Sequence, residues 1–126
     1  MGAEWFVDCT DDVSNADEAF DKLVHEAYFN YGHNGYSGTI CEKDGYITFP
    51  IPEFILEDIH SYHDVEDLIE YVSSEGYNAM GHDKKGKKGW AAKVYETIDD
   101  KWGPAGCFIY NSNYGKMYYF FGWASC

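Results

Sequence analysis

The segment Gly81–Gly89 has the outline of a phosphate-binding loop. Its spacing, Gly81-x-x-x-x-Gly86-Lys87, matches loops whose backbone amides and lysine hold the phosphates of a nucleotide. Lys88, however, stands where such loops place a serine or threonine for magnesium. These loops also open a helix whose N-terminus faces the phosphate, whereas Trp90–Ile98 is predicted to form a strand. We therefore expect a solvated loop and not a site of nucleotide hydrolysis.

A second candidate is the polar connection that follows the first predicted helix. Gly35-Tyr36-Ser37-Gly38-Thr39 nearly matches a nucleophile elbow, but Thr39 replaces the last glycine and the segment runs from helix to strand, the reverse of the required order. No catalytic role is therefore expected for Ser37. The same connection could instead bind a small ligand or nucleotide, with the lysine loop closing over an anionic group. The residues of this alternative site are His33, Asn34, Tyr36 and Ser37.

The histidines and cysteines do not form a metal-binding pattern. His60-x-x-His63 could place two imidazoles one helical turn apart, but local spacing fixes no third ligand. The four cysteines contain no C-x-x-C pair, and small reduced core residues are expected. The 22 acids supply too many candidates to single out one acid–base pair. We expect no metal, no cofactor and no enzymatic activity.

The charge of the chain excludes several classes of partner. Its formal net charge is −13, and it contains no arginine. Arginine is the residue that most often forms bidentate hydrogen bonds with phosphates and with guanine bases. Direct binding to nucleic acid or to an acidic membrane surface is therefore not expected. The acids are also concentrated, because residues 1–83 hold 19 of the 22 acids and two of the nine lysines. The sequence shows neither a signal peptide nor a membrane span, which predicts a cytoplasmic protein.

The elements that must position these side chains predict a single acidic α+β domain over residues 1–126. Apolar residues at helical spacing predict a helix over Ala16–Tyr31, capped by Ser14 or Asn15 with Asp17 or Glu18 three residues on, and a second helix over Asp64–Ser74. The predicted strands are Trp5–Thr10, Tyr36–Glu42, Tyr46–Phe49, Trp90–Ile98, Cys107–Tyr110 and Lys116–Trp123, with a hairpin turn at Lys43-Asp44-Gly45. This order predicts a mostly antiparallel sheet of about six strands with two amphipathic helices on one face.

If both helices lie on one face, their acids would form one outward negative field. Carboxylates repeating along two helices can stand in for the phosphates of a nucleic acid and bind a basic groove. The partner would be a basic protein, itself a nucleic-acid-binding one. The predicted partner-binding residues are Asp17, Glu18, Asp21, Glu57, Asp58, Glu66, Asp67 and Glu70.

Aromatic residues support a partner surface more weakly. The chain has 12 tyrosines and 4 tryptophans, types that are enriched in binding hot spots. They could equally form a sheet face packed beneath the helices. If Lys116–Trp123 were an edge strand, it would allow a homodimer.

The stretch His33–Tyr46, HNGYSGTICEKDGY, resembles a G-Y-(S/T)-G-T-I-x-E-K pattern found in small proteins of phages and bacteria. Cys41 departs from the pattern, where a small residue such as alanine is expected. The resemblance implies no activity and no catalytic residue. It implies a small phage-type accessory protein, a setting in which acidic inhibitors of host nucleic-acid enzymes are common. We therefore expect an acidic inhibitor that mimics nucleic acid to block the basic groove of a host or defence protein, acting in the host cytoplasm if it is phage-encoded.

Overall fold

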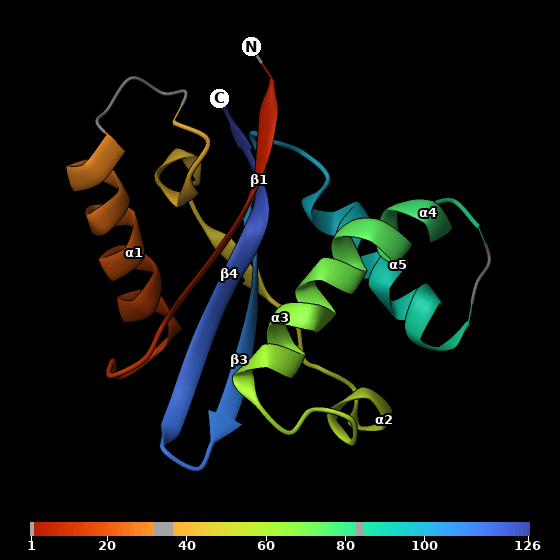
Figure 1. Ribbon diagram of the computed structural model, residues 1–126. Helices are drawn as coiled ribbons and strands as arrows, with labels where there is room; N and C mark the ends of the chain where they lie inside the picture. Colours follow the sequence, from red (N-terminus) through yellow and green to blue (C-terminus); the bar gives the residue numbers. More distant parts are fainter. Residues whose placement is uncertain (1, 32–36, 83–84) are drawn as a thin grey trace.

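The computed structural model describes residues 2–31, 37–82 and 85–126 as a four-stranded sheet between two helical layers (Figure 1). The strand order is β1-β4-β3-β2, in which β4 is antiparallel to β1 and to β3, and β2 is parallel to β3. The strands are β1 (Ala3–Thr10), β2 (Tyr46–Thr48), β3 (Ala105–Ser112) and β4 (Gly115–Ser125). The helices are α1 (Ala16–Tyr31), η1 (Ile40–Glu42), α2 (Glu53–Leu56), α3 (Tyr62–Tyr71), η2 (Val72–Gly76), α4 (Tyr77–Ala79) and α5 (Gly86–Ile98).

Strand β4 divides the core into two parts because its side chains alternate between the faces of the sheet. Tyr118 and Phe120 pack with the buried residues of α1, whereas Tyr119 and Phe121 pack with those of α3 and α5. All four side chains are buried. The aromatic residues near the C-terminus therefore build the sheet core, and Figure 1 shows α1 on one side of the sheet with α3, α4 and α5 on the other.

The start of α1 follows the predicted cap. The side-chain oxygen of Asn15 accepts a hydrogen bond from the Glu18 amide (2.8 Å), and the Glu18 carboxylate accepts one from the Ser14 amide (3.3 Å). Asn15 thus caps α1 by accepting from one of the amides that the first helical turn leaves without a partner, and Glu18 reaches back to the residue before this cap. The buried face of α1 consists of Ala19, Phe20, Leu23 and Ala27.

The helices on the opposite face form a continuous packed layer. The segment from α3 through η2 to α4 crosses α5, and Gly76 lies at the crossing. A Cβ atom at Gly76 would stand 2.7 Å from the backbone oxygen of Ala91 in α5. Only glycine permits this approach. A hydrogen bond from the Trp123 indole to the Tyr95 hydroxyl (2.9 Å) joins this layer to β4.

Five predictions about the elements are wrong. The part of the chain that the structure describes forms four strands and not six. Trp90–Ile98 belongs to α5, because Ala91, Val94, Tyr95 and Ile98 are buried at helical spacing. A strand was predicted over Tyr36–Glu42, but Ile40–Glu42 form the short helix η1. Tyr46–Thr48 therefore has no hairpin partner there and pairs in parallel with β3.

The fourth error concerns the faces of the sheet. α1 and α3 lie on opposite faces, not on one. Moreover, Lys116–Trp123 belongs to the central strand β4. The prediction that this segment is an edge strand able to form a dimer is therefore wrong. The edge strands are β1 and β2, and β1 is the longer one.

Lys43 anchors the segment after η1. Its side chain is buried, and its ammonium donates to the backbone oxygens of Asp100 (3.2 Å), Lys101 (3.2 Å) and Gly103 (3.1 Å). Burial lowers the pKa of Lys43 to about 8, while the charge of Asp100 opposes this change. The bonds tie residues near β2 to the loop between α5 and β3.

Candidate partner-binding site

The structure separates the carboxylates that were predicted to form one acidic face. α1 and α3 pack against opposite faces of the sheet, so their exposed sides point away from each other (Figure 1). The premise of a single patch on two neighbouring helices is therefore wrong. The residues concerned are Asp17, Glu18 and Asp21 of α1, Glu57 and Asp58 after α2, and Glu66, Asp67 and Glu70 of α3.

The acids at the start of α1 have local roles. The Tyr46 hydroxyl donates a hydrogen bond to the Asp17 carboxylate. Burial, followed by this hydrogen bond, raises the pKa of Tyr46. Asp17 and Asp21 line a cavity of about 640 Å³ beside β2, and Glu18 completes the helix cap. Asp17 and Asp21 therefore lie toward β2, and Glu18 stabilises the start of α1.

The acids of α3 divide between two sides of that helix. Glu66 and Glu70 line a cavity of about 540 Å³ next to β1. Asp67 and Asp58 line a different cavity, of about 640 Å³, which α2, α3 and the start of α5 enclose. Of the eight predicted partner-binding residues, only Glu66 and Glu70 thus lie beside the long edge strand.

Strand β1 carries an open edge. Gly2 and Cys126 exchange two backbone hydrogen bonds of 3.2 Å, and in an antiparallel ladder such pairs recur at every second residue. Glu4, Phe6, Asp8 and Thr10 therefore pair with β4. The amides and carbonyls of Ala3, Trp5, Val7 and Cys9 point away from the sheet, and no residue in the described ranges is seen to pair with them.

On the α1 side of this edge lies a polar groove, which we call the α1-side groove. It is a cavity of about 390 Å³ that contains the carboxylates of Glu4, Asp8 and Glu26. Gly38, whose φ is +70°, has the Glu4 carboxylate where a Cβ would stand. Burial, and next the charge of Glu26, raises the pKa of Asp8. The remaining polar lining residues are Asn30, Ser37 and Thr39.

On the opposite side lies the α3-side groove, the 540 Å³ cavity lined by Trp5, Val7, Cys9, Glu66, Glu70, Ser73 and Tyr119. Its floor is apolar, and Val7 leaves 42% of its surface exposed there. Burial, followed by the charge of Glu66, raises the pKa of Cys9. The groove therefore combines an apolar strand surface with a negatively charged helix.

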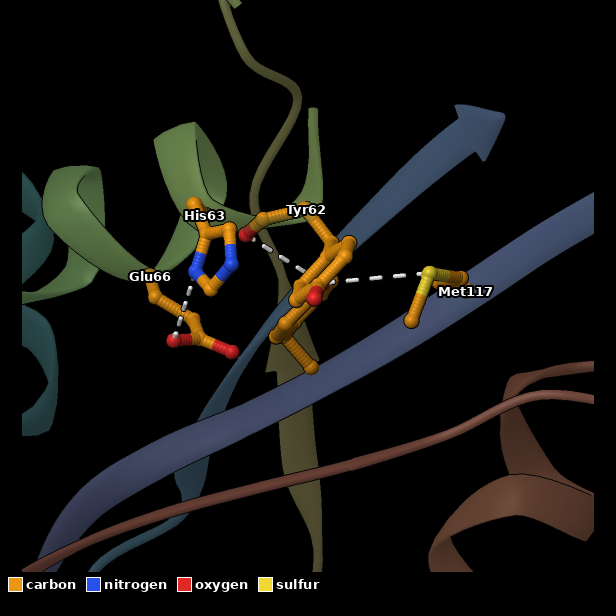
Figure 2. A network of polar contacts seen from close by, with 5 residues as sticks. Tyr62, His63, Glu66 and Met117 are labelled. Carbon is orange, nitrogen blue, oxygen red and sulfur yellow. Dashed lines mark hydrogen bonds and ion pairs between the residues drawn. The ribbon is translucent and has the colours of Figure 1, made fainter. Parts of the chain in front are cut away.

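Figure 2 shows the polar contacts that adjoin the α3-side groove. His63 and Glu66 lie side by side on α3, with 3.9 Å between the His63 Nδ1 and a Glu66 oxygen. The Tyr119 hydroxyl donates to the backbone oxygen of Tyr62 (3.4 Å) and contacts the Met117 sulfur (3.9 Å). Burial is the main cause of the raised pKa of Tyr119, and the charges of Cys9 and Glu66 add to it. The start of α3 is thus held against β4 by a neutral phenol.

Four of the five carboxylates beside β1 have no cationic partner in the described ranges. Within the described ranges, the ion pairs are His63 with Glu66 and Lys88 with Glu75, each at 3.9 Å. No lysine or histidine nitrogen there lies within 4.0 Å of the carboxylates of Glu4, Asp8, Glu26 or Glu70. Like charges at both sides of one strand therefore repel one another, and within the described ranges the His63–Glu66 pair alone offsets this repulsion.

Sequence reasoning missed three of these residues: Glu4, Asp8 and Glu26. The alternation of β1 already places Glu4 and Asp8 on the face of Phe6, and Glu26 follows in the predicted helix. The sequence pattern of β1 thus contained this information, but grouping Glu26 with Glu4 and Asp8 also requires knowing that α1 packs against the same face of the sheet. Helical periodicity identifies the buried side of a helix and not the sheet face that it covers.

Ser37 is the one member of the alternative ligand site that the structure describes. His33, Asn34 and Tyr36 lie outside the described residues. The Ser37 hydroxyl bonds to the Glu42 carboxylate and lies 2.8 Å from the Thr39 hydroxyl and 3.0 Å from the Cys41 sulfur. The Ser37 amide also donates to Glu42 (3.0 Å). Its polar groups are thus engaged within this turn.

The lysine-rich segment opens a helix, contrary to our prediction. α5 begins at Gly86, and Lys85 precedes it without a side-chain cap. The argument that this segment exits into a strand is therefore wrong. Lys87 lies over the ring of Tyr71 (4.2 Å to its centre), and it shares a cavity with Asp58, Asp64 and Asp67. Those carboxylates oppose the binding of an anion there.

The described ranges also bear on the predicted histidine pair and on membrane insertion. Those ranges contain no cluster of three or more histidine, cysteine, aspartate or glutamate side chains arranged to hold a metal ion. The His60 amide donates to the Asp64 carboxylate (2.8 Å). No helix in them combines the length and the apolar character needed to span a bilayer.

Comparisons of the chain with protein-family models, with curated proteins and with solved structures find no match.

Proposed function

We propose that this protein is a non-enzymatic binding protein that engages a basic partner protein through the open edge of β1. The observation that carries the proposal is the set of carboxylates at both sides of that edge: Glu4, Asp8 and Glu26 in one groove, and Glu66 and Glu70 in the other. Of these five, Glu66 has the neighbouring His63, and the other four have no ion-pair partner in the described ranges. Cations from a partner would relieve their mutual repulsion. Complementary charge also accelerates association, and salt weakens it.

The geometry changes how mimicry of a nucleic acid would work. Two helices on one face were expected to present a continuous row of charges. The separation of α1 from α3 leaves two shorter rows, one on each side of β1. Blocking the nucleic-acid groove of a partner stays a prediction, and it now depends on the edge of β1 rather than on two helix surfaces.

The alternative, a small-ligand or nucleotide site, receives less support. The Ser37 hydroxyl is already bonded to Glu42, and the groove beside it is lined by carboxylates that repel an anionic ligand. We therefore place binding at the charged edge and assign no catalytic residue.

The test compares two variants with the same change in net charge. The edge variant carries Asp8→Asn, Glu26→Gln, Glu66→Gln and Glu70→Gln. The distal variant carries Glu53→Gln, Glu57→Gln, Asp58→Asn and Asp67→Asn, all at exposed positions away from β1. Each protein is immobilised and exposed to a bacterial lysate at low and at high salt, and the eluted proteins are identified by mass spectrometry.

We expect the unmodified protein and the distal variant to retain the same basic proteins at low salt. The edge variant should lose them. Equal loss by both variants would show that net charge and not location governs binding. Retention by the edge variant would refute the proposed function.

A further inference from the structure

We propose that the partner adds a strand: an extended segment with a basic side chain at every second residue pairs with the open edge of β1. This inference deepens the proposed function and rests on it. It commits to one occupant, a basic extended segment of another protein. Charge alone would accept any basic surface, whereas strand addition requires a free backbone and a defined alternation of side chains.

The backbone of β1 meets the first requirement. Ala3, Trp5, Val7 and Cys9 each direct one amide and one carbonyl outward, at a repeat of about 7 Å along the strand. β1 has eight residues, long enough to align a partner strand. The other edge strand, β2, has three residues and is followed by Pro50 and Pro52, so it offers a poorer template.

The two grooves meet the second requirement, because an added strand would send alternate side chains into each. The α1-side groove holds three carboxylates and a polar lining, which suits lysine or arginine. The α3-side groove has Trp5, Val7 and Tyr119 below its two carboxylates, which suits aliphatic side chains. The pattern recognised is therefore basic–aliphatic–basic–aliphatic.

Charge argues against a second copy of this chain as the occupant. Pairing β1 with β1 would bring Glu4, Asp8 and Glu26 of both copies together, with no lysine of the described ranges within 4.0 Å of them. Like charges on an edge strand are a common protection against such self-association. The same charges attract a basic strand.

The probe is an acetylated and amidated octapeptide in which lysine and valine alternate. Its matched control has the same sequence with N-methyl groups on alternate amides, which keeps the charge and removes the donors that face β1. A third peptide has four lysines followed by four valines. Affinity is measured by calorimetry, and hydrogen exchange is measured at the β1 amides.

We expect the alternating peptide to bind about tenfold or more tightly than the N-methylated one, because the latter forfeits several backbone hydrogen bonds. The block peptide should also bind more weakly. On binding, the amides of Trp5, Val7 and Cys9 should exchange more slowly. The double variant Asp8→Asn/Glu26→Gln should lose more affinity for the alternating peptide than the double variant Glu66→Gln/Glu70→Gln.

Equal binding of the alternating, N-methylated and block peptides would overturn strand addition, as would no binding of any of them or unchanged exchange at Trp5, Val7 and Cys9. The proposed function fails separately. If the edge variant still captures the same basic proteins from a lysate, the charged edge is not the binding surface, whatever the peptides do.

Discussion

Replacing Lys43 by methionine should remove a specific pH dependence of stability. Burial lowers the pKa of Lys43 from 10.5 to about 8. In the unfolded chain the amine keeps its ordinary pKa, so between pH 8 and 10.5 the unfolded state binds this proton more tightly than the folded state does. The free energy of unfolding therefore rises with pH in that window. From pH 7 to pH 9 the gain is about 1 kcal/mol.

Other groups titrate in the same range with the opposite sign. Burial raises the pKa of Cys107 to about 11, so its thiol costs stability as pH rises above 9. The raised pKa values of Tyr46 and Tyr119 act the same way at still higher pH. Because Lys43→Met retains all three groups, the difference in stability between the two proteins isolates the lysine.

The assay is urea unfolding at pH 7 and pH 9, followed by tryptophan fluorescence. The stability of the unmodified protein minus that of Lys43→Met should increase by about 1 kcal/mol between the two pH values, whichever way the substitution shifts stability at pH 7. Lys93→Met, at an exposed position of α5, is the control and should show no such increase. A difference that does not change with pH would refute the account of a desolvated ammonium.

Three further predictions concern packing and charge. Gly76→Ala should destabilise the protein by about 2 kcal/mol or more in urea unfolding, because the new Cβ would stand 2.7 Å from a backbone oxygen of α5, whereas Gly45→Ala, with no atom within 4 Å of its Cβ, should be nearly neutral. Asp8→Asn should raise the melting temperature at pH 7, because it removes a carboxylate whose pKa burial raises. The folded protein binds the Asp8 proton more tightly than the unfolded chain does. The difference in melting temperature should therefore shrink as the pH falls and the unmodified carboxyl becomes protonated. An advantage that stays constant down to acid pH would contradict the burial argument. Tyr46→Phe should lower stability at pH 7 by about 1 kcal/mol through loss of the hydrogen bond to Asp17, and no effect in thermal unfolding would show that the bond contributes nothing.

The sequence predicted correctly those helices and strands in which the spacing of apolar residues fits only one kind of element. The helix at Ala16–Tyr31 has the predicted bounds and cap, and the strands predicted at Trp5–Thr10, Cys107–Tyr110 and Lys116–Trp123 lie within β1, β3 and β4. Trp90–Ile98 was misassigned because tryptophan, valine, tyrosine, threonine and isoleucine favour strands. The burial of Ala91 and Ile98 against α3 and the sheet decided for a helix.

The site was harder to predict than the elements, because it depends on which face each helix covers. Glu66 and Glu70 were predicted and do lie beside β1, whereas Asp17 and Asp67 point elsewhere. Connection lengths from β1 to α1 and from β2 to α3 allow either face. Only the tertiary packing of Phe20 and Val65 on opposite sides of β4 fixes the arrangement.

The pairing of β1 with β4 has a consequence for biosynthesis. Residue 3 lies opposite residue 125, and β4 supplies Tyr118, Phe120 and Ala124 to the buried cluster beneath α1. A nascent chain leaving the ribosome therefore exposes β1 and α1 without β4 until the residues of β4 have been synthesised. Contacts this distant in sequence also slow folding. Throughout that interval both edges of β1 are unpaired, and the acids that line the strand disfavour its pairing with other chains.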